Sequence, residues 1–203
     1  MSYVLEVLPA LLNGAVVTLQ VFFIVIVLSI PLGIVLAFLM QIKFKPLNWL
    51  LTLYVWIMRG TPLLLQLIFV YYVLPSVGIV FDRLPAAILA FTLNYAAYFA
   101  EIYRSGIESM PVGQYEAAEI LGYSKSQTFL HIILPQVIKR ILPSVTNEVI
   151  TLVKDTSLAF AISYIELFTE TQMIAASETS MLPYLAAAIF YYVFNLVVAG
   201  LMK

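Results

Sequence analysis

The chain has 203 residues, of which 63% are hydrophobic and only 10% are charged, and its formal net charge is −1. Soluble domains are about one quarter charged, so this composition favours a single membrane domain over residues 1–203, and the near-neutral charge argues against a nucleic-acid partner. The lack of cysteine excludes disulfides, thiolate metal sites and a cysteine nucleophile. A single histidine, His131, removes most histidine-based metal and catalytic-triad chemistry.

The first apolar run, from Val7 to Ile42, contains no Asp, Glu, Lys or Arg. A helix needs roughly 20 apolar residues to cross the hydrocarbon core, so we expect a first membrane-spanning helix over about residues 13–40. The run Pro31-Leu32-Gly33 predicts a kink in this helix, which neighbouring helices in a membrane bundle can tolerate.

The second predicted span covers about residues 47–75 and is interrupted by Arg59-Gly60-Thr61-Pro62. Proline disfavours helix in the residue before it, so the helix should break there. The piece before the break either extends the span or lies at the membrane interface. A third helix is predicted over 84–109 and ends at Met110-Pro111-Val112-Gly113.

A polar loop (residues 113–134) follows the third helix. The segment EAAEILG predicts a short helix that stops at Gly122, because alanine and glutamate are good helix formers and glycine is a common helix stop. A second short helix is predicted over SKSQTFLHIIL, before Pro135. Such helices can dock on a partner or lie on the membrane surface.

The fourth predicted span covers residues 135–168 and breaks at Lys154-Asp155-Thr156-Ser157, after which an apolar helix resumes to about Phe168. A loop follows, and the fifth span covers residues 183–202. The acidic residues assigned to that loop are Glu166, Glu170 and Glu178.

Five spans place the two ends of the chain on opposite sides of the membrane. Basic residues are enriched in cytoplasmic loops, and here they gather on one side of the predicted topology. They are Lys43 and Lys45 in the first loop and Arg104, Lys125, Lys139 and Arg140 around the polar loop. We therefore expect a cytoplasmic polar loop and C-terminus, and an N-terminus outside the cell.

Two polar stripes follow helical spacing within the predicted spans. The first consists of Asn94, Tyr98, Glu101 and Ser105, and the second of Ser144, Glu148, Thr151 and Asp155 with Asn147 and Lys154 beside it. Ionisable groups at membrane depth cost about 2.5–3.5 kcal/mol on insertion scales and usually face a bundle interior or an aqueous cavity. The stripes therefore line a path for a polar solute or pair with one another, as Glu101 could with Arg104 or Lys154.

A helix that restarts after the Lys154–Ser157 break would expose backbone N–H groups suited to a carboxylate. Thr156 and Ser157 are good capping residues for such a start. An amino acid needs an anion site, which this start and Lys154 could supply, and a cation site, which an acidic residue could supply. The candidate substrate-binding residues are Asn94, Tyr98, Glu101, Glu148, Lys154, Asp155, Thr156 and Ser157.

The polar loop has a specific spacing: E-A-A, three residues, G, nine residues, then I-x-L-P. The matching residues are Glu116-Ala117-Ala118, Gly122, Ile132, Leu134 and Pro135. This pattern resembles the EAA loop of permease subunits in ATP-binding-cassette importers. The Arg59–Pro62 run, AYFAEIYRSGI at 97–107 and Lys154-Asp155-Thr156-Ser157-Leu158 resemble the polar amino acid uptake branch of that family, the histidine, arginine and glutamine type.

The resemblance implies an all-α integral membrane protein with the type I importer permease fold: five transmembrane helices and a cytoplasmic coupling-helix loop. Glu116, Ala117, Ala118 and Gly122 would dock in a groove of a separate ATPase subunit. The chain has no G-x-x-x-x-G-K-[ST] phosphate loop, so it is not expected to be an enzyme or to bind a cofactor, and ATP and Mg²⁺ would lie on the ATPase.

The other implied partners are a second permease subunit, either an identical or a sister chain, and an extracytoplasmic amino-acid-binding protein. The implied location is the bacterial cytoplasmic membrane, and the implied mechanism is alternating access. Acidic residues outnumber Lys154 in the predicted path, which favours arginine, lysine or histidine as substrate over glutamine or another polar amino acid. The competing classes are a self-contained secondary transporter or channel, and a structural membrane subunit without a solute path.

Overall fold

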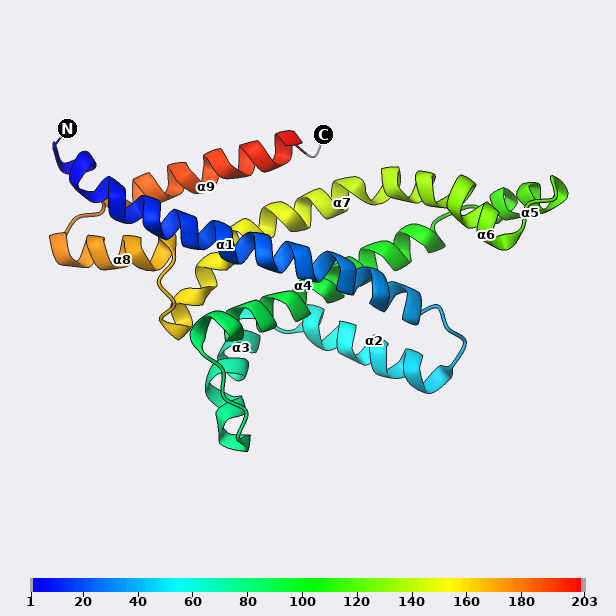
Figure 1. Ribbon diagram of the computed structural model, residues 1–203, viewed down its shortest axis with the longest axis horizontal. Helices are drawn as coiled ribbons and strands as arrows, with labels where there is room; N and C mark the ends of the chain where they lie inside the picture. Colours follow the sequence, from blue (N-terminus) through cyan, green and yellow to red (C-terminus); the bar gives the residue numbers. More distant parts are fainter. Residues whose placement is uncertain (1, 202–203) are drawn as a thin grey trace.

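The computed structural model describes residues 2–201, and every regular element in this range is helical. Figure 1 shows an elongated bundle in which α1 runs along most of its length, with α5 and α6 at one end. The α-helices are α1 (Ser2–Leu39), α2 (Lys45–Gly60), α3 (Leu63–Ile68), α4 (Arg83–Glu108), α5 (Val112–Ile120), α6 (Lys125–Gln127), α7 (Leu134–Asp155), α8 (Leu167–Glu178) and α9 (Leu182–Leu201). Two π-helical segments (Phe69–Val73 and Thr128–Ile133) and two 3₁₀ segments (Leu74–Val77 and Thr156–Ile162) extend them.

The helix α1 begins at Ser2, well before the predicted start near residue 13, and continues through Pro31 without interruption. Gly33 is a packing site here. A methyl group at this position would lie 2.6 Å from the Phe99 Cβ and 3.1 Å from the Ala96 carbonyl oxygen. Small residues at helix contacts allow membrane helices to approach closely, so Gly33 sets the separation of α1 and α4.

The helix α4 is the central element, because it packs against α1, α2, α3 and α7. Most of its small and aromatic side chains are fully enclosed by these neighbours. The buried ones are Ala86, Ala87, Ala90, Phe91, Tyr95, Ala96, Ala97, Phe99 and Ala100. Side chains on α4 are therefore held in fixed positions relative to the surrounding helices.

The break between α2 and α3 lies at Thr61 and Pro62, which both have extended backbone conformations. The two helical pieces meet at an angle of 108°. Figure 1 shows α3 and the segment after it pointing away from the bundle while α2 runs back along it. The two predicted alternatives, that the piece before the break extends the span or lies at the membrane interface, therefore both stay open, and any span that includes α2 and α3 is sharply bent.

The predicted second short helix of the polar loop does not end before Pro135. Helical backbone continues from Lys125 to Asp155, and the N–H of Leu134 donates to the carbonyl of Phe129, five residues earlier. This π-helical widening accommodates a proline, which has no N–H and whose ring needs space in the preceding turn. The short helix and α7 are therefore one element.

The α-helix ends within the predicted break at Lys154–Ser157, but no gap separates it from the helical backbone that follows. The helix α7 passes directly into the 3₁₀ segment at Thr156, which ends at Ser163 with a left-handed φ of 53°. The prediction of an apolar helix up to Phe168 is wrong, because Phe168 belongs to α8. The acidic residues assigned to a loop after Phe168 instead start, occupy and end α8, with Glu166 at its N-cap.

Glu166 is completely buried and joins three helices. Its carboxylate accepts hydrogen bonds from the N–H groups of Phe168 (2.9 Å) and Thr169 (2.8 Å) at the start of α8. It also accepts from Thr18 on α1 (3.3 Å) and Tyr191 on α9 (3.2 Å). A buried carboxylate is costly unless it is hydrogen-bonded, so this network fixes α8 between α1 and α9.

Within residues 2–201, two helical stretches are long and apolar enough to cross a membrane, Val7–Leu39 and Leu182–Leu201, and the bent pair of α2 with residues 63–77 would make a third span. The number of spans therefore stays a prediction for α4 and α7. The last residue of the predicted fifth span, 202, lies outside the described residues.

The Gly33→Ala variant tests the contact between α1 and α4. The added methyl would collide with Phe99, and overpacking of this kind costs about 1–3 kcal/mol. We expect a lower melting temperature of the purified protein, measured by tryptophan fluorescence in detergent. Gly200→Ala is the control, because nothing lies within 4 Å of a methyl added there. Equal melting temperatures for the two variants would show that the contact is not tight.

Candidate substrate cavity and coupling loop

A polar cavity of about 300 Å³ lies where the broken end of α2 meets α4 and α7. This is the lower end of the size range for ligand pockets. Its lining residues are Thr61, Pro62, Leu63, Asn94, Tyr95, Tyr98, Glu148, Thr151 and Asp155. The structure therefore brings together Asn94, Tyr98, Glu148 and Asp155 from the predicted set, and leaves Glu101, Lys154, Thr156 and Ser157 outside the lining.

The wall of the polar cavity that α7 contributes is acidic. Glu148 is half-buried and makes no hydrogen bond or ion pair with any residue in the described range. Asp155 accepts a hydrogen bond of 2.7 Å from the hydroxyl of Tyr95, which is itself buried. No basic residue belongs to the lining, so the cavity favours positively charged groups.

The same residues do not form a recognisable metal site. Residues 2–201 contain no group of three or more His, Cys, Asp or Glu side chains placed to hold a metal ion.

The break in α2 is held open by two amide side chains. The helical partner of the Met58 carbonyl would be the N–H of Pro62, which proline lacks. The Asn94 Nδ2 and the Gln66 Nε2 both donate to this carbonyl, each at 2.9 Å. Asn94 also donates to the Gln66 Oε1 at 2.9 Å, and Gln66 donates to the Thr61 hydroxyl at 2.8 Å. The Asn94 amide nitrogen is thus engaged by the protein backbone.

Sequence reasoning missed Gln66 and Tyr95 as parts of this site. A signal for Gln66 was present, because it is an isolated amide in an apolar run just after the break. No comparable signal marks Tyr95, which is next to Asn94 and off the polar stripe. Its contact with Asp155 depends on how α4 and α7 cross.

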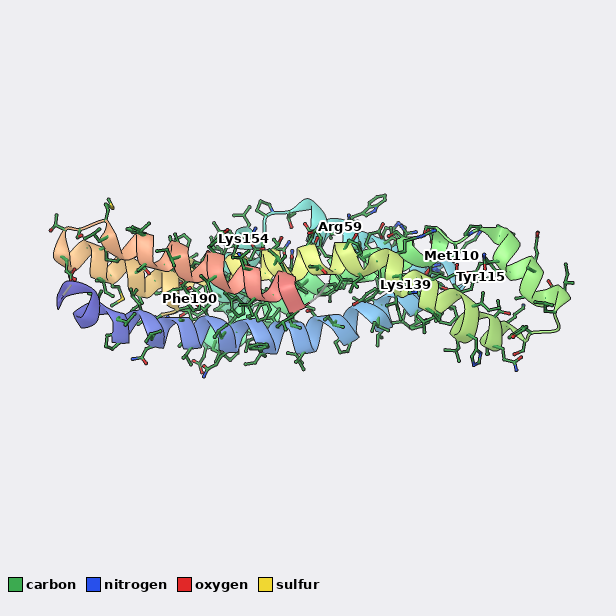
Figure 2. The ribbon with its side chains drawn as sticks, turned by 90° about the horizontal axis from the view of Figure 1, so that it is seen from above. Arg59, Met110, Tyr115, Lys139, Lys154 and Phe190 are labelled. Carbon is green, nitrogen blue, oxygen red and sulfur yellow. The ribbon has the colours of Figure 1, made fainter. Side chains whose placement is uncertain are left out.

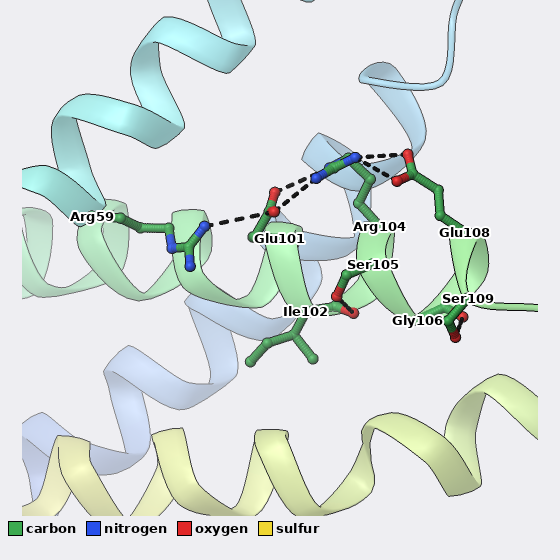
Figure 3. A network of polar contacts seen from close by, with 8 residues as sticks. All are labelled: Arg59, Glu101, Ile102, Arg104, Ser105, Gly106, Glu108 and Ser109. Atoms are coloured by element: carbon green, nitrogen blue, oxygen red, sulfur yellow. Dashed lines mark hydrogen bonds and ion pairs between the residues drawn. The ribbon is translucent and has the colours of Figure 1, made fainter.

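Glu101 belongs to a chain of charges outside the cavity lining (Figure 3). Arg104 donates to both oxygens of Glu101, at 2.7 and 3.0 Å, and to both oxygens of Glu108, at 2.6 and 2.7 Å. Arg59 forms a longer ion pair with Glu101 at 3.6 Å. Of the alternatives left open by the sequence, Glu101 pairs with Arg104, and it lies outside the cavity lining.

The predicted anion site at Lys154–Ser157 is not formed as expected. The hydroxyls of Thr156 and Ser157 donate back to the carbonyls of Val153 and Lys154, both at 2.7 Å, so they do not cap a new helix. The N–H of Thr156 stays bonded to the preceding turn. Lys154 is exposed and forms no ion pair within residues 2–201; Figure 2 labels it near the middle of the molecule.

The polar loop forms a compact tip at the end of the molecule, where α5 and α6 meet (Figure 1). Gly122 ends α5 with a left-handed φ of 81°. Its N–H donates to the Glu119 carbonyl (2.9 Å), and the Tyr123 N–H donates to the Ala118 carbonyl (3.0 Å). These two bonds define a Schellman motif, in which glycine is the residue best suited to the left-handed position.

The exposed side of this tip is apolar. Ile120 is 86% exposed and Leu121 is 72% exposed, whereas Ala118 of the EAA sequence is buried. Glu116 is exposed on the same helix, and a hollow of about 320 Å³ lies beside it, lined by Tyr115, Glu119, Tyr123, Lys125 and Thr128. Exposed apolar side chains next to a polar rim are typical of a protein-binding surface.

The model of the family described as "Binding-protein-dependent transport system inner membrane component" matches residues 29–203. Among curated proteins of Bacillus subtilis (strain 168), the L-cystine transport system permease protein TcyB is 36% identical over 91% of this chain and 80% of its own. The arginine transport system permease protein ArtQ is 35% identical over 97% and 90%. The probable glutamine ABC transporter permease protein GlnP is 38% identical over 96% and 91%.

A solved structure described as an amino acid ABC transporter with histidines is also similar. Its chain superimposes with a TM-score of 0.92 and 30% identity, covering 98% of this chain and 94% of that one. Because the superposition covers nearly the whole chain, the helices around the polar cavity are arranged as in that ABC transporter.

The Gln66→Leu variant tests how the break in α2 is held. It removes the donor to Met58 and Thr61 and the acceptor of Asn94, which leaves half-buried polar groups without partners at a cost of about 1–3 kcal/mol. We expect a melting temperature lower by about 2–10 °C in differential scanning fluorimetry. Gln136→Leu, at an exposed position on α7, is the control, and a drop of the same size there would contradict the role of Gln66.

Proposed function

The chain belongs to the family of binding-protein-dependent transport system inner membrane components, and from this premise we propose that it is the membrane subunit through which an importer passes a cationic amino acid. It is an amino-acid ABC transporter permease with transmembrane helices, and it is not an enzyme, since ATP hydrolysis takes place on a separate chain. The substrate class, the partners and the topology given below are proposals.

The observation that carries the substrate proposal is the acidic wall of the polar cavity. Glu148 and Asp155 both line it, and no basic residue does. Arginine, lysine and protonated histidine carry two positive groups, and two carboxylates match them. Glutamine carries only its ammonium group, so it would leave one carboxylate of the cavity without a countercharge. The relatives named above transport or are assigned cystine, arginine and glutamine, so a glutamine importer is the alternative.

The polar cavity would open alternately to the two sides of the membrane, driven by the ATPase. In this proposal the ATPase holds ATP and Mg²⁺ and receives the tip of the polar loop, with Glu116, Ala117 and Ala118 on α5 and Gly122 at its end. Leu121 and Ile120 support the contact, because they expose apolar surface at that tip. A second permease subunit and an extracytoplasmic amino-acid-binding protein complete the complex.

The proposed topology has five spans: α1, the bent pair α2–α3, α4, α7 and α9. On α4 and α7, Glu148 and Asp155 line the polar cavity and Glu101 pairs with Arg104, which is how ionisable groups are accommodated at membrane depth. The basic residues around the polar loop support a cytoplasmic position for this loop, with the N-terminus outside and the C-terminus inside a bacterial cytoplasmic membrane.

Glu148→Gln tests the cation site. A hydrogen bond to a charged group contributes about 1.5–3 kcal/mol, which corresponds to a loss of roughly tenfold or more in apparent affinity. We expect uptake of arginine into proteoliposomes that contain the complete complex to be weakened by at least that factor. Asn94→Ala is the comparison variant and should weaken uptake less, because the amide nitrogen of Asn94 donates to the Met58 carbonyl at the α2 break.

The same assay separates the two substrate classes. Wild-type uptake of glutamine without uptake of arginine, lysine or histidine would support the alternative and contradict the charge argument. Unchanged arginine uptake by Glu148→Gln would remove this residue from the binding site.

Leu121→Asp tests the docking surface. A carboxylate at this exposed apolar position would have to lose its hydration on contact with the ATPase. We expect the variant to keep its melting temperature but to lose co-purification with the ATPase. Val80→Asp, at an equally exposed site in the segment between the 3₁₀ turn and α4, is the control. Retained co-purification and retained ATP-dependent uptake with Leu121→Asp would exclude this surface as the docking site for the ATPase. Uptake that needs no ATPase would favour a secondary transporter.

A further inference from the structure

An amino acid in the polar cavity brings a carboxylate as well as an ammonium group, and the cavity lining offers this carboxylate no cation. Lys154 is exposed and lies outside the lining, and the backbone N–H of Thr156 is bonded within the preceding turn. A different cation lies beside the cavity. Arg59 is in the last turn of α2, two positions before Thr61, which lines the cavity.

Arg59 is in contact with the cavity wall. Its guanidinium carbon lies 5.5 Å from the centre of the Tyr98 ring, and Tyr98 lines the cavity. This is a cation–π distance, and such a contact holds the cation weakly, at about 0.5–1 kcal/mol where it is exposed. The Arg59 side chain is 41% exposed, so it has room to move around the edge of the ring.

The ion pair between Arg59 and Glu101 is long, at 3.6 Å, and Glu101 shares it with Arg104 (Figure 3). Both oxygens of Glu101 already accept hydrogen bonds from Arg104, at 2.7 and 3.0 Å, whereas Arg59 is 3.6 Å away. Arg59 donates no hydrogen bond to any residue within the described range 2–201. Its planar set of N–H donors, which fits a carboxylate in a two-bond arrangement, is therefore available.

We infer that Arg59 binds the α-carboxylate of the transported amino acid. The guanidinium turns from Glu101 around the Tyr98 ring toward the cavity, and Glu101 stays neutralised by Arg104. Glu148 and Asp155 then take the positive groups of the substrate from the opposite wall. This inference rests on the proposed function and specifies the anion side of the same site, which the sequence placed at Lys154.

Arg59 could instead serve only to join α2 to α4 through Glu101. That structural role would make its removal equally harmful for every ligand. A role in carboxylate binding has a different signature, because it affects only ligands that have the carboxylate. The two roles are therefore separated by comparing an amino acid with its decarboxylated analogue.

The experiment measures equilibrium binding to the detergent-purified complex of this chain with its ATPase. The ligand pairs are arginine with agmatine, and glutamine with 4-aminobutanamide, so that either substrate class is covered. We expect the wild-type complex to bind the amino acid of one pair at least tenfold more tightly than its analogue. Arg59→Met should reduce this ratio to nearly one, because it weakens the binding of the amino acid but not that of the analogue. Arg59→Lys should restore part of the ratio.

Lys154→Met is the matched control, because it removes an exposed basic side chain that lies outside the cavity lining while leaving Arg59, Glu101 and Arg104 in place. Its ratio should equal that of the wild type. Three results would each overturn the inference. They are equal loss of affinity for both ligands in Arg59→Met, an unchanged affinity ratio in that variant, and an affinity ratio near one in the wild type. Failure of the wild-type complex to bind arginine, lysine, histidine or glutamine would overturn the proposed function itself.

Discussion

The close contact between α1 and α4 is the constraint on which the rest of the structure depends. Gly33 leaves no room for even a methyl group beside Phe99, and the alanines of α4 let its other neighbours approach equally closely. In a membrane, where apolar side chains gain little from leaving lipid, such packing is a main source of helix association. A central helix fixed in this way can place its polar groups accurately: Asn94 at the α2 break, Tyr95 at Asp155, and Glu101 beside Arg59.

A missing hydrogen-bond donor organises the site around that helix. Pro62 cannot satisfy the Met58 carbonyl, so α2 ends, turns through a bend of 108°, and needs Asn94 and Gln66 as substitute donors. The bend brings Thr61 and Pro62 to the polar cavity. It also leaves Arg59 at a free helix end next to Tyr98. The N–H group that proline lacks thus leads both to the bend that forms the cavity and to the position of Arg59 beside it.

The carboxylates of α4 and α7 differ in their surroundings, because one is paired with an arginine and two line the polar cavity. Glu101 is neutralised by Arg104 within one helix, at a spacing that would pair them in any helix. Glu148 has no such neighbour on α7 and faces the polar cavity, and Asp155 is held by Tyr95 from the opposite helix. Three carboxylates that look alike in the sequence therefore have different availability to a substrate, and this difference is the basis of the proposed charge selectivity.

The sequence by itself determined the helical membrane class, the break at Pro62, the Gly122 helix stop and four members of the cavity, because composition, proline and glycine chemistry and helical spacing are local properties. It located the end of the α-helix within Lys154–Ser157, but not the hydrogen bonds that turn Thr156 and Ser157 back to the preceding turn, and it missed Tyr95, Gln66 and the cap at Glu166. Those features depend on which helices cross and where: Thr18 and Tyr191 meet Glu166 from distant parts of the chain, and α7 continues through Pro135 because a π-helical turn makes room for it. Only the tertiary structure decided them, since no pattern along the chain encodes contacts between helices far apart in sequence.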